Sequence, residues 1–413
     1  MHRFASSSLL GKSLASGVLA SLTWACAAVG QGASPSELVL VPRSELSARG
    51  VDPRRVQEAV QQVMTRALSD SAFPGAIAVV GTHSGVVAAV AVGALDWSAG
   101  SGTPNEATLW DLASLTKVVA LTSAVMQLSS SGKLNLDAPV QRYIPEWTGP
   151  WKDQVRVRDL LTHTAGLPAW RPLYKEAESR AGAIALVVST PLEVAPGQRT
   201  VYSDLGAILM GQIVERVSGE PFDEYVKERI FTPLGMRTTR FRPPTAWRDH
   251  IAPTEVDPWR QRHLRGEVHD ENAFRLGGVS SHAGLFSSAA DLTRFARMLL
   301  GLGALDGVRV LDSTTLKAFT TVQDARLSAR GIGWETANGN NSGGRRMSRR
   351  AFGHTGFTGT SLWVDPERDV FVLLLSNRVN PTRENRRIGD VRISLADAAM
   401  TAMERGSSGG TRP

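Results

Sequence analysis

The chain has 413 residues, of which 42% are hydrophobic, 6% aromatic and 21% charged. These values are ordinary for a globular protein, and the length indicates one large two-lobed unit or two domains. The formal net charge is +7, but the basic clusters are not interleaved with an aromatic reader motif, so we expect no nucleic-acid partner. The absence of a repeat of fixed period argues against a solenoid or a propeller.

Residues 1–30 have the pattern of a targeting segment. Arg3 and Lys12 precede a charge-free stretch from Ser13 to Gly30, whose small residues fit a cleavage site. An uncleaved membrane anchor is the alternative, since the stretch is close to the minimum spanning length. Cys26, the only cysteine, lies in this segment, so cleavage after it leaves no thiol. We expect an exported protein, periplasmic or secreted, that meets a membrane only through an uncleaved anchor.

Two pairs of apolar strands lie near the two ends of the chain. Gly75 to Val80 and Val86 to Val92 form one hairpin pattern, and Thr360 to Val364 with Val370 to Ser376 form the other. Near-continuous apolar runs are typical of strands that are buried on both faces. The two patterns predict a sheet that is built from both chain ends.

Helical spacing surrounds and separates these hairpins. Pro53 to Leu68 and Val391 to Met403 are predicted to flank the sheet. The predicted helices between the hairpins are Leu115 to Ser130, Leu205 to Val217, Phe222 to Ile230 and Ala289 to Leu300. We therefore expect an α/β (α+β) fold, with an antiparallel sheet lobe flanked by helices and an inserted, mainly helical lobe. Its domain is predicted at residues 51–403, after a linker at 31–50 and before a disordered tail at 404–413.

Ser114-Leu-Thr-Lys117 is the first candidate catalytic motif. A serine hydroxyl is a weak nucleophile until a neighbouring base takes its proton. Residues three apart on a helix face the same side, so Ser114 and Lys117 would meet, at a helix N-terminus that favours developing negative charge. Ser130-Ser-Gly-Lys133 has the same spacing, but Gly132 marks it as the end of a helix. We assign the nucleophile to Ser114.

Tyr202-Ser-Asp204 is the second candidate motif, in a turn that leads into a predicted helix. A phenol in a cationic site can lose its proton near neutral pH and act as a base. The alternative is a structural tyrosine beside a helix start that is capped by Asp204. We favour the catalytic interpretation, because Tyr202 lies between the other two motifs along the chain.

His354-Thr-Gly356 is the third candidate motif, just before an apolar strand. Glycine at this point lets the backbone approach a substrate closely. We predict that the backbone N–H groups of Phe357 and Ser114 form an oxyanion hole. Thr162-His-Thr-Ala-Gly166 is similar, but no apolar strand follows it directly, so we interpret it as a structural turn.

A metal enzyme is the main rival among the catalytic classes. His269-Asp270-Glu271 is the best candidate cluster, but the chain has no His-Glu-x-x-His pattern. Adjacent residues on a loop seldom converge on one ion, so we interpret the cluster as structural or as lining the cleft. We expect no metal site and no cofactor.

Together these residues resemble the superfamily of class C β-lactamases and DD-peptidases. The segments that carry the resemblance are Ser114-Leu-Thr-Lys117, Leu160-Leu-Thr-His-Thr-Ala-Gly-Leu-Pro168, Tyr202-Ser-Asp204, Gly284-Leu-Phe-Ser287 and Gly353-His-Thr-Gly-Phe-Thr-Gly359. The resemblance implies that Ser114 is the acylated nucleophile and that Lys117 and Tyr202 handle its proton. The residues implied in substrate binding are Asp204, His354, Thr355, Gly356 and Phe357.

Two positions depart from the common pattern of that superfamily. His354 stands where β-lactamases usually carry lysine, and histidine is only partly charged at neutral pH. Asp204 stands where asparagine is more frequent, and a carboxylate cannot donate an amide hydrogen bond. Asp204 can instead pair with Lys117 and hold it protonated, which would move the base role towards Tyr202.

The combined prediction is an exported active-site serine hydrolase that works through an acyl-enzyme and resembles a DD-carboxypeptidase acting on D-alanyl peptides. An esterase or a weak β-lactamase with the same site is the close alternative. A catalytically silent cell-wall binding protein is a third hypothesis, from another class. The expected partner is a small molecule or a peptide, namely a peptidoglycan-like peptide, a β-lactam or an ester. Arg378, after the last strand, is a candidate to meet a substrate carboxylate.

Overall fold

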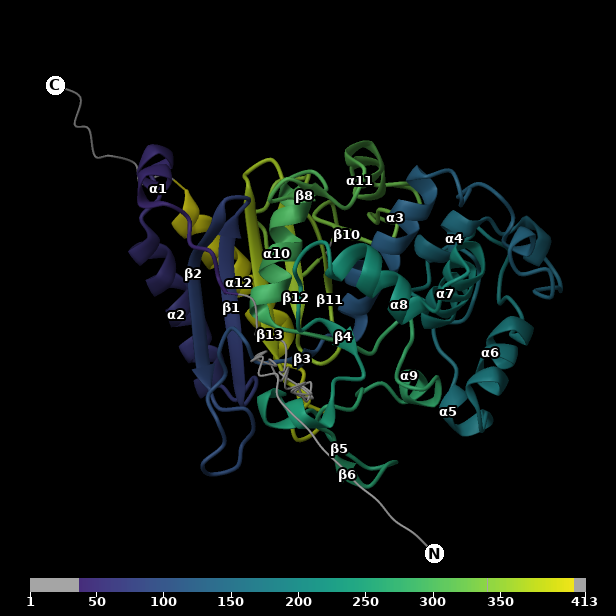
Figure 1. Ribbon diagram of the computed structural model, residues 1–413, viewed down its shortest axis with the longest axis horizontal. Helices are drawn as coiled ribbons and strands as arrows, with labels where there is room; N and C mark the ends of the chain where they lie inside the picture. Colours follow the sequence, from purple (N-terminus) through teal and green to yellow (C-terminus); the bar gives the residue numbers. More distant parts are fainter. Residues whose placement is uncertain (1–36, 340, 405–413) are drawn as a thin grey trace, which may run out of the picture. The chain divides into compact units, whose positions relative to one another are not determined.

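The computed structural model describes residues 37–339 and 341–404, so the predicted targeting segment and residues 405–413 of the predicted tail lie outside the described residues. Its largest sheet is antiparallel and has the strand order β10-β11-β12-β13-β1-β2 (Figure 1). The strand bounds are β1 Gly75–Thr82, β2 Gly85–Gly93, β10 Glu335–Thr336, β11 Phe352–Thr355, β12 Ser361–Asp365 and β13 Val370–Ser376. Strand β1 pairs with β13, which joins the two predicted hairpins and confirms a sheet built from both ends of the chain.

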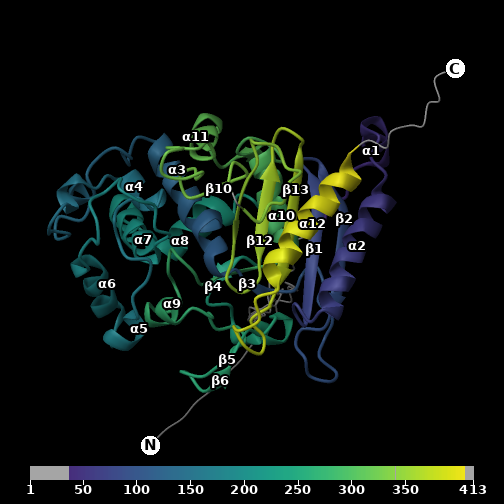
Figure 2. The ribbon, with the colours of Figure 1, turned by 180° about the vertical axis from the view of Figure 1, so that it is seen from behind.

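The two faces of the sheet are covered by different helices. Helices α2 (Pro53–Ser69) and α12 (Ile388–Met403) lie on one face, which Figure 2 turns to the viewer, and α10 (Ala289–Leu300) lies on the other. Side chains alternate along a strand, so Ala76, Ala78 and Val80 join the cluster with α2 and α12 while Ile77 and Val79 join the cluster with α10. The continuous apolar run of β1 is therefore explained by burial on both faces.

The prediction of a linker at residues 31–50 is wrong for residues 37–50. It contains α1 (Arg43–Arg49), and Val41 and Leu46 are buried in the same cluster as α2. The backbone also joins the edge strand, since Val41 N–H donates to the carbonyl of Val86 at 3.0 Å. Residues 37–50 are thus part of the sheet lobe, and a seven-residue helix without a side-chain cap left no clear signal in the sequence.

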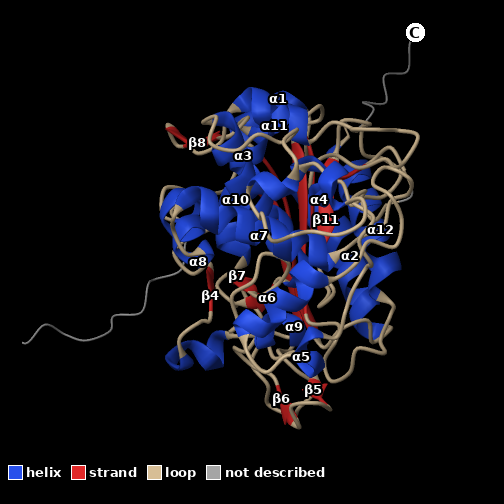
Figure 3. Cartoon of the chain, turned by 90° about the vertical axis from the view of Figure 1, so that its right-hand side faces the viewer, coloured by secondary structure: helices blue, strands red, loops and turns tan. Residues whose placement is uncertain are grey.

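The inserted residues are mainly helical, as predicted. Their helices are α3 Ser123–Ser130, α4 Val157–Leu161, α5 Leu173–Glu176, α6 Arg180–Ser189, α7 Asp204–Ser218, α8 Phe222–Val226, α9 Glu271–Arg275 and α11 Ser313–Phe319. Short strands connect them, namely β3 Trp110–Asp111, β4 Arg240–Phe241, β5 Val256–Asp257, β6 Arg262–His263, β7 Leu285–Ser287, β8 Ala304–Leu305 and β9 Val308–Arg309. Figure 3 shows α5, α6 and α9 grouped together, and α5 contacts both of the others.

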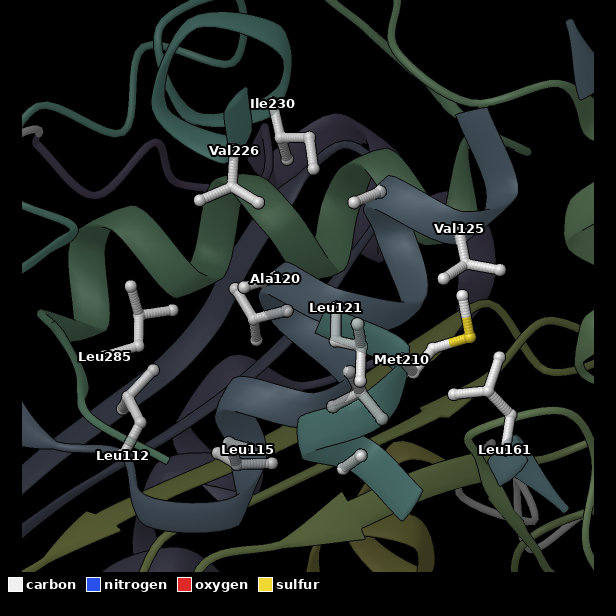
Figure 4. Packing of buried hydrophobic residues seen from close by; sticks show 14 of the residues in the cluster. Leu112, Leu115, Ala120, Leu121, Val125, Leu161, Met210, Val226, Ile230 and Leu285 are labelled. Atoms are coloured by element: carbon white, nitrogen blue, oxygen red, sulfur yellow. The ribbon is translucent and has the colours of Figure 1, made fainter. Parts of the chain in front are cut away.

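The helix predicted from Leu115 to Ser130 is not one regular α-helix. A 3₁₀ turn at Ala113–Leu115 leads into a π-helical segment at Lys117–Thr122, and α3 follows. Leu115 and Leu121 point into a packed core with Met210 of α7 (Figure 4). This packing fixes the segment that carries Ser114 and Lys117. Within residues 37–339 and 341–404, none of the helices is long and apolar enough to cross a membrane.

Candidate active site

Ser114 lies on a tight turn between β3 and the π-helical segment. Ala113 has a positive φ of 45°, which is unusual for a residue with a side chain, and its N–H donates to Asp111 Oδ1 at 2.8 Å. The hydroxyl of Thr116 closes the turn by donating to the carbonyl of Ala113. The turn therefore holds Ser114 within the 3₁₀ turn Ala113–Leu115, and Lys117 is the first residue of the π-helical segment that follows.

Lys117 is buried and all three of its ammonium hydrogens have acceptors. Its Nζ donates to Ser114 Oγ at 3.0 Å and to the carbonyl of His282 at 2.9 Å, and it lies 2.8 Å from Asp204 Oδ1. Burial by itself would lower the pKa of Lys117, but the Asp204 carboxylate and Tyr202 outweigh it and raise the pKa above its usual value. The ion pair expected from Asp204 is present, and Lys117 is an ammonium at neutral pH.

Tyr202 faces both of these residues. Its hydroxyl hydrogen-bonds with the side chains of Ser114 and Lys117. Burial raises the pKa of Tyr202 above its usual value, and Lys117 only partly opposes this effect because Asp204 offsets its charge. In the resting site this shift favours the neutral phenol and not the phenolate that we expected. Tyr202 is therefore a neutral phenol at rest, with a hydroxyl that can both accept and donate a proton.

His163 lies in the segment that we interpreted as a structural turn, and it supports Tyr202. Its Nδ1 accepts the backbone N–H of Ser203 at 3.1 Å, and its ring centroid lies 4.6 Å from that of Tyr202. Burial, with Arg330 and Lys117, lowers the pKa of His163 well below 6.5, so the ring is neutral. The resemblance of its segment to the third motif was the available signal, but spacing alone could not reveal the contact with Tyr202.

The third motif lies at the end of β11 and is pressed against the turn of Ser114. A Cβ added at Gly356 would lie 2.1 Å from Thr360 Oγ1 and 2.3 Å from the carbonyl oxygen of Leu112, so only glycine fits. Thr360 and Thr358 donate to the carbonyls of Leu112 and Asp111. The motif thus touches the nucleophile turn, which is the arrangement that an oxyanion hole of Ser114 and Phe357 N–H groups needs. That hole stays a prediction.

His354 does not supply a positive charge. It is 2% exposed, and its Nδ1 donates to the carbonyl of Thr355 at 2.8 Å. Burial, with Arg330 and Lys117, lowers the pKa of His354 well below 6.5. The difference from a lysine at this position is therefore larger than the sequence indicated, since His354 is neutral rather than partly charged.

Asp270 and His282 add a second acidic group to the site. His282 Nε2 lies 2.9 Å from Asp270 Oδ1, and its Nδ1 lies 2.7 Å from Ser280 Oγ. Burial by itself would raise the pKa of Asp270, but His282 outweighs it and holds the pKa below its usual value. Asp204, Asp270 and His282 have ligand atoms within 4.8 Å of one another, a spacing that could suit a metal ion. The Lys117 ammonium already pairs with Asp204, which disfavours a second cation there.

The cluster His269-Asp270-Glu271 does not converge on one point. His269 Nε2 lies 3.0 Å from Glu255, Asp270 turns to His282, and Glu271 pairs with Arg383. Each of the three residues thus has its own partner, which agrees with a structural role for His269 and Glu271, while Asp270 lies at the site beside Asp204.

Two arginines hold the backbone of the third motif. Arg392 donates to the carbonyls of Gly356 and Thr360 at 2.7 and 2.8 Å. Arg378, our candidate for a substrate carboxylate, donates its Nε to the carbonyl of Phe357 at 2.7 Å and its Nη1 to two further carbonyls. Arg378 is therefore placed to position Phe357, and those donors are already used.

Comparisons with known proteins identify similar chains. A family model described as Beta-lactamase matches residues 56–397. A protein of Escherichia coli (strain K12) named "Putative D-alanyl-D-alanine carboxypeptidase" is 37% identical over 305 residues, which cover 66% of this chain and 69% of the relative. One of the same name from Escherichia coli O157:H7 is 35% identical and covers 75% and 79%.

Solved structures share the fold. A penicillin-binding protein homologue from Caulobacter crescentus has a TM-score of 0.70 and 23% identity, and covers 85% of this chain and 98% of its own. A class C beta-lactamase has a TM-score of 0.68 and 18% identity, and covers 85% and 97%. The hydrolase EstCE1 has a TM-score of 0.69 and 21% identity, and covers 84% and 99%. The mixed fold of helices and antiparallel sheet is thus confirmed.

Proposed function

The chain belongs to the beta-lactamase family of serine hydrolases, and from this premise we propose that it is an exported DD-carboxypeptidase that cleaves D-alanyl peptides through an acyl-enzyme on Ser114. The observation that carries the acyl-enzyme step is the hydrogen bonding of Ser114 with Lys117 and Tyr202. The D-alanyl substrate is supported by the names of the relatives at 37% and 35% identity.

Tyr202 can accept the proton of Ser114 without becoming charged, because it gives up its own proton in the same step. Lys117 donates to Ser114 Oγ, so the serine directs its own proton elsewhere, towards the oxygen of Tyr202. As Ser114 bonds to the substrate carbonyl carbon, Tyr202 takes this proton and gives its own to the leaving nitrogen. D-alanine leaves as a neutral amine. Water then attacks the ester and returns a proton through Tyr202 to Ser114, so the cycle closes without a phenolate.

An assay of D-alanine release tests this function. The native protein should free D-alanine from an acyl-D-alanyl-D-alanine peptide, and Ser114→Ala should not. Turnover of the peptide by Ser114→Ala at the native rate would contradict the nucleophile. Native protein that hydrolyses simple esters through Ser114 but leaves the peptide intact would contradict the substrate.

Ester hydrolysis is the second candidate function, and Asp204 is the observation that favours it. Its Oδ1 is engaged with Lys117, and a carboxylate has no hydrogen to donate to the acyl amide of a peptide. An ester substrate does not need that donor. The ratio of kcat/KM between the D-alanyl peptide and phenyl acetate, whose acyl group carries no amide, decides between the two candidates.

Export rests on the sequence pattern of residues 1–30. Expression of the full chain, followed by cell fractionation and N-terminal mass analysis, tests it. Recovery of the uncleaved chain in the cytoplasm would contradict export.

A further inference from the structure

The backbone carbonyl of His282 is one of the three acceptors of the Lys117 ammonium. Lys117 Nζ lies 2.9 Å from this oxygen, and its other two acceptors are Ser114 Oγ at 3.0 Å and Asp204 Oδ1 at 2.8 Å. Lysine is a compact charge on a flexible stem, so the direction of its hydrogens is set by the acceptors around it. The Asp204 carboxylate attracts the ammonium more strongly than a neutral hydroxyl does. The His282 carbonyl therefore helps to keep one hydrogen directed at Ser114.

The ring of His282 is held at both of its nitrogens. Nε2 lies 2.9 Å from Asp270 Oδ1, and Nδ1 lies 2.7 Å from Ser280 Oγ. His282 is 1% exposed, so water does not compete for these contacts. A ring that is fixed at two points cannot turn freely, and the backbone that carries it is fixed as well.

Asp270 is itself anchored at the start of α9. Its Oδ1 accepts the backbone N–H of Ala273 at 2.7 Å, which caps that helix. Burial by itself would raise the pKa of Asp270, but His282 and Lys117 help to hold it below its usual value. The partner of the His282 ring is therefore a carboxylate in a fixed position.

The segment around His282 has other attachments to the fold. The hydroxyl of Ser281 donates to the carbonyl of Ala207 in α7 at 2.8 Å, and the N–H of Leu285 donates to Thr116 Oγ1 at 3.2 Å. These bonds hold the segment on both sides of His282 without the ring. The contact of His282 with Asp270 is thus left to set the direction of the carbonyl between them.

Ser280, His282 and Asp270 are also the residue types of a catalytic triad. Ser280 is 6% exposed and His282 is 1% exposed, so this hydroxyl is not open to a substrate. The three residues are therefore better suited to hold the backbone than to act as a second nucleophile.

We propose that Asp270 and His282 are positioning residues for acyl transfer, which fix the His282 carbonyl and so direct the Lys117 ammonium at Ser114. Neither side chain needs to touch the substrate. The inference rests on the proposed function only for the roles of Ser114 and Lys117 in forming the acyl-enzyme, and it does not depend on a D-alanyl substrate.

Hydrolysis of 3-acetoxybenzamide, an uncharged aryl ester, tests the inference without relying on peptidase activity. We expect Asp270→Ala to lower kcat/KM about ten- to a hundredfold, as for a small misplacement of a catalytic group. Asp270→Asn keeps an oxygen that can accept from His282, and its kcat/KM should stay within about threefold of the native value.

A double-mutant cycle with Lys117→Met separates positioning from a general structural effect. If Asp270 acts through Lys117, then Asp270→Ala should change kcat/KM less than about twofold in the Lys117→Met protein. A general structural effect would lower kcat/KM by the same factor with and without Lys117, and equal factors would overturn the inference.

Asp312→Ala is the matched control for the helix cap. Asp312 caps α11 in the same way, since its Oδ1 accepts the N–H of Thr315 at 2.7 Å. Its loss should lower Tm but leave kcat/KM unchanged. Circular dichroism and Tm of each variant establish that it is folded. If Asp270→Ala does not fold, Ser280→Ala removes the other bond of the ring and enters the same cycle, with an expected loss of about fivefold.

Two further results would also overturn the inference. They are a native kcat/KM in the folded Asp270→Ala variant, and an Asp270→Asn variant that is as slow as Asp270→Ala. The proposed function fails separately, when the native protein hydrolyses the ester through Ser114 but releases no D-alanine from the peptide.

Discussion

Lys117 and His354 are two basic side chains of one site, and both are almost completely buried, at 3% and 2% exposed. Burial lowers the pKa of each, yet Lys117 stays charged and His354 is neutral. Part of the difference is intrinsic, because lysine has a much higher ordinary pKa than histidine. Their partners widen it, since the Asp204 carboxylate at 2.8 Å outweighs burial at Lys117, while burial and the cations Arg330 and Lys117 all lower the pKa of His354.

Removal of Lys117, the charged residue of this comparison, should have the largest effect on activity. Lys117→Met deletes the ammonium that donates to Ser114 and leaves Asp204 without its counter-charge. We expect kcat/KM for 3-acetoxybenzamide to fall about 10³-fold, within the range for loss of a proton-handling group. A fall of less than tenfold in a folded variant would contradict the role of Lys117.

Gly356→Ala should disturb the surroundings of His354, the other residue of this comparison, because Gly356 follows the strand that contains His354. The new Cβ meets Thr360 and the carbonyl of Leu112, so the third motif must move away from the turn of Ser114. We expect a fall in kcat of about 10²-fold, as for loss of one oxyanion donor. Gly389→Ala is the control, because nothing lies within 4 Å of its added Cβ. Equal activities of the two variants would rule out the close contact.

Asp204→Asn should lower the pKa of Lys117 and so make Lys117 more like the neutral His354. Without the carboxylate, burial is no longer outweighed and the pKa of Lys117 falls. We therefore expect the alkaline limb of the pH profile of kcat/KM to move to lower pH by at least about one unit. Asp223→Asn, which breaks an ion pair with the exposed Arg242, should leave the profile unchanged. Superimposable profiles of the native protein and Asp204→Asn would contradict the account.

The smallest effect concerns stability below neutral pH. The pKa values of His163 and His354 in the folded protein lie well below the 6.5 of the unfolded chain. The unfolded state binds more protons below pH 6.5, so the free energy of unfolding should decrease as the pH falls through that value. The loss is about 1 kcal/mol per pH unit for each ring. Denaturant unfolding at pH 7.5 and 5.5 measures it, and His354→Gln should reduce the dependence. A dependence unchanged in that variant would show that His354 is not the source.

Much of the fold could be predicted from the order of the motifs and the pattern of the strands. Ser114 and Lys117 are three residues apart on one helical turn, so their contact follows from local geometry. The pairing of Asp204 with Lys117 was also predictable, because the two motifs had to meet in any active site that uses both. Alternating burial explains why the continuous apolar strands formed a sheet covered on two faces.

The charge states of the site residues could not be predicted from the sequence in this way. The pKa shifts of Tyr202 and His354 come first from burial and then from charges on separate segments of the chain, with Lys117 and Asp204 acting on Tyr202 and with Arg330 and Lys117 acting on His354. His163 lies in a segment that we interpreted as a structural turn, and Arg330 lies in none of the motifs; the importance of both arises from their positions around the Tyr202 ring. The combined effect of such charges on a pKa depends on how the fold brings separate segments together, and not on the spacing of residues along the chain.

The central claim is a covalent acyl-enzyme on Ser114, and intact-mass spectrometry after addition of a penicillin tests it most directly. The account predicts an adduct of the mass of the opened penicillin on the native protein, and no adduct on Ser114→Ala. An adduct of equal yield on Ser114→Ala would contradict the account, as would native protein that is never acylated by penicillin or by an activated ester.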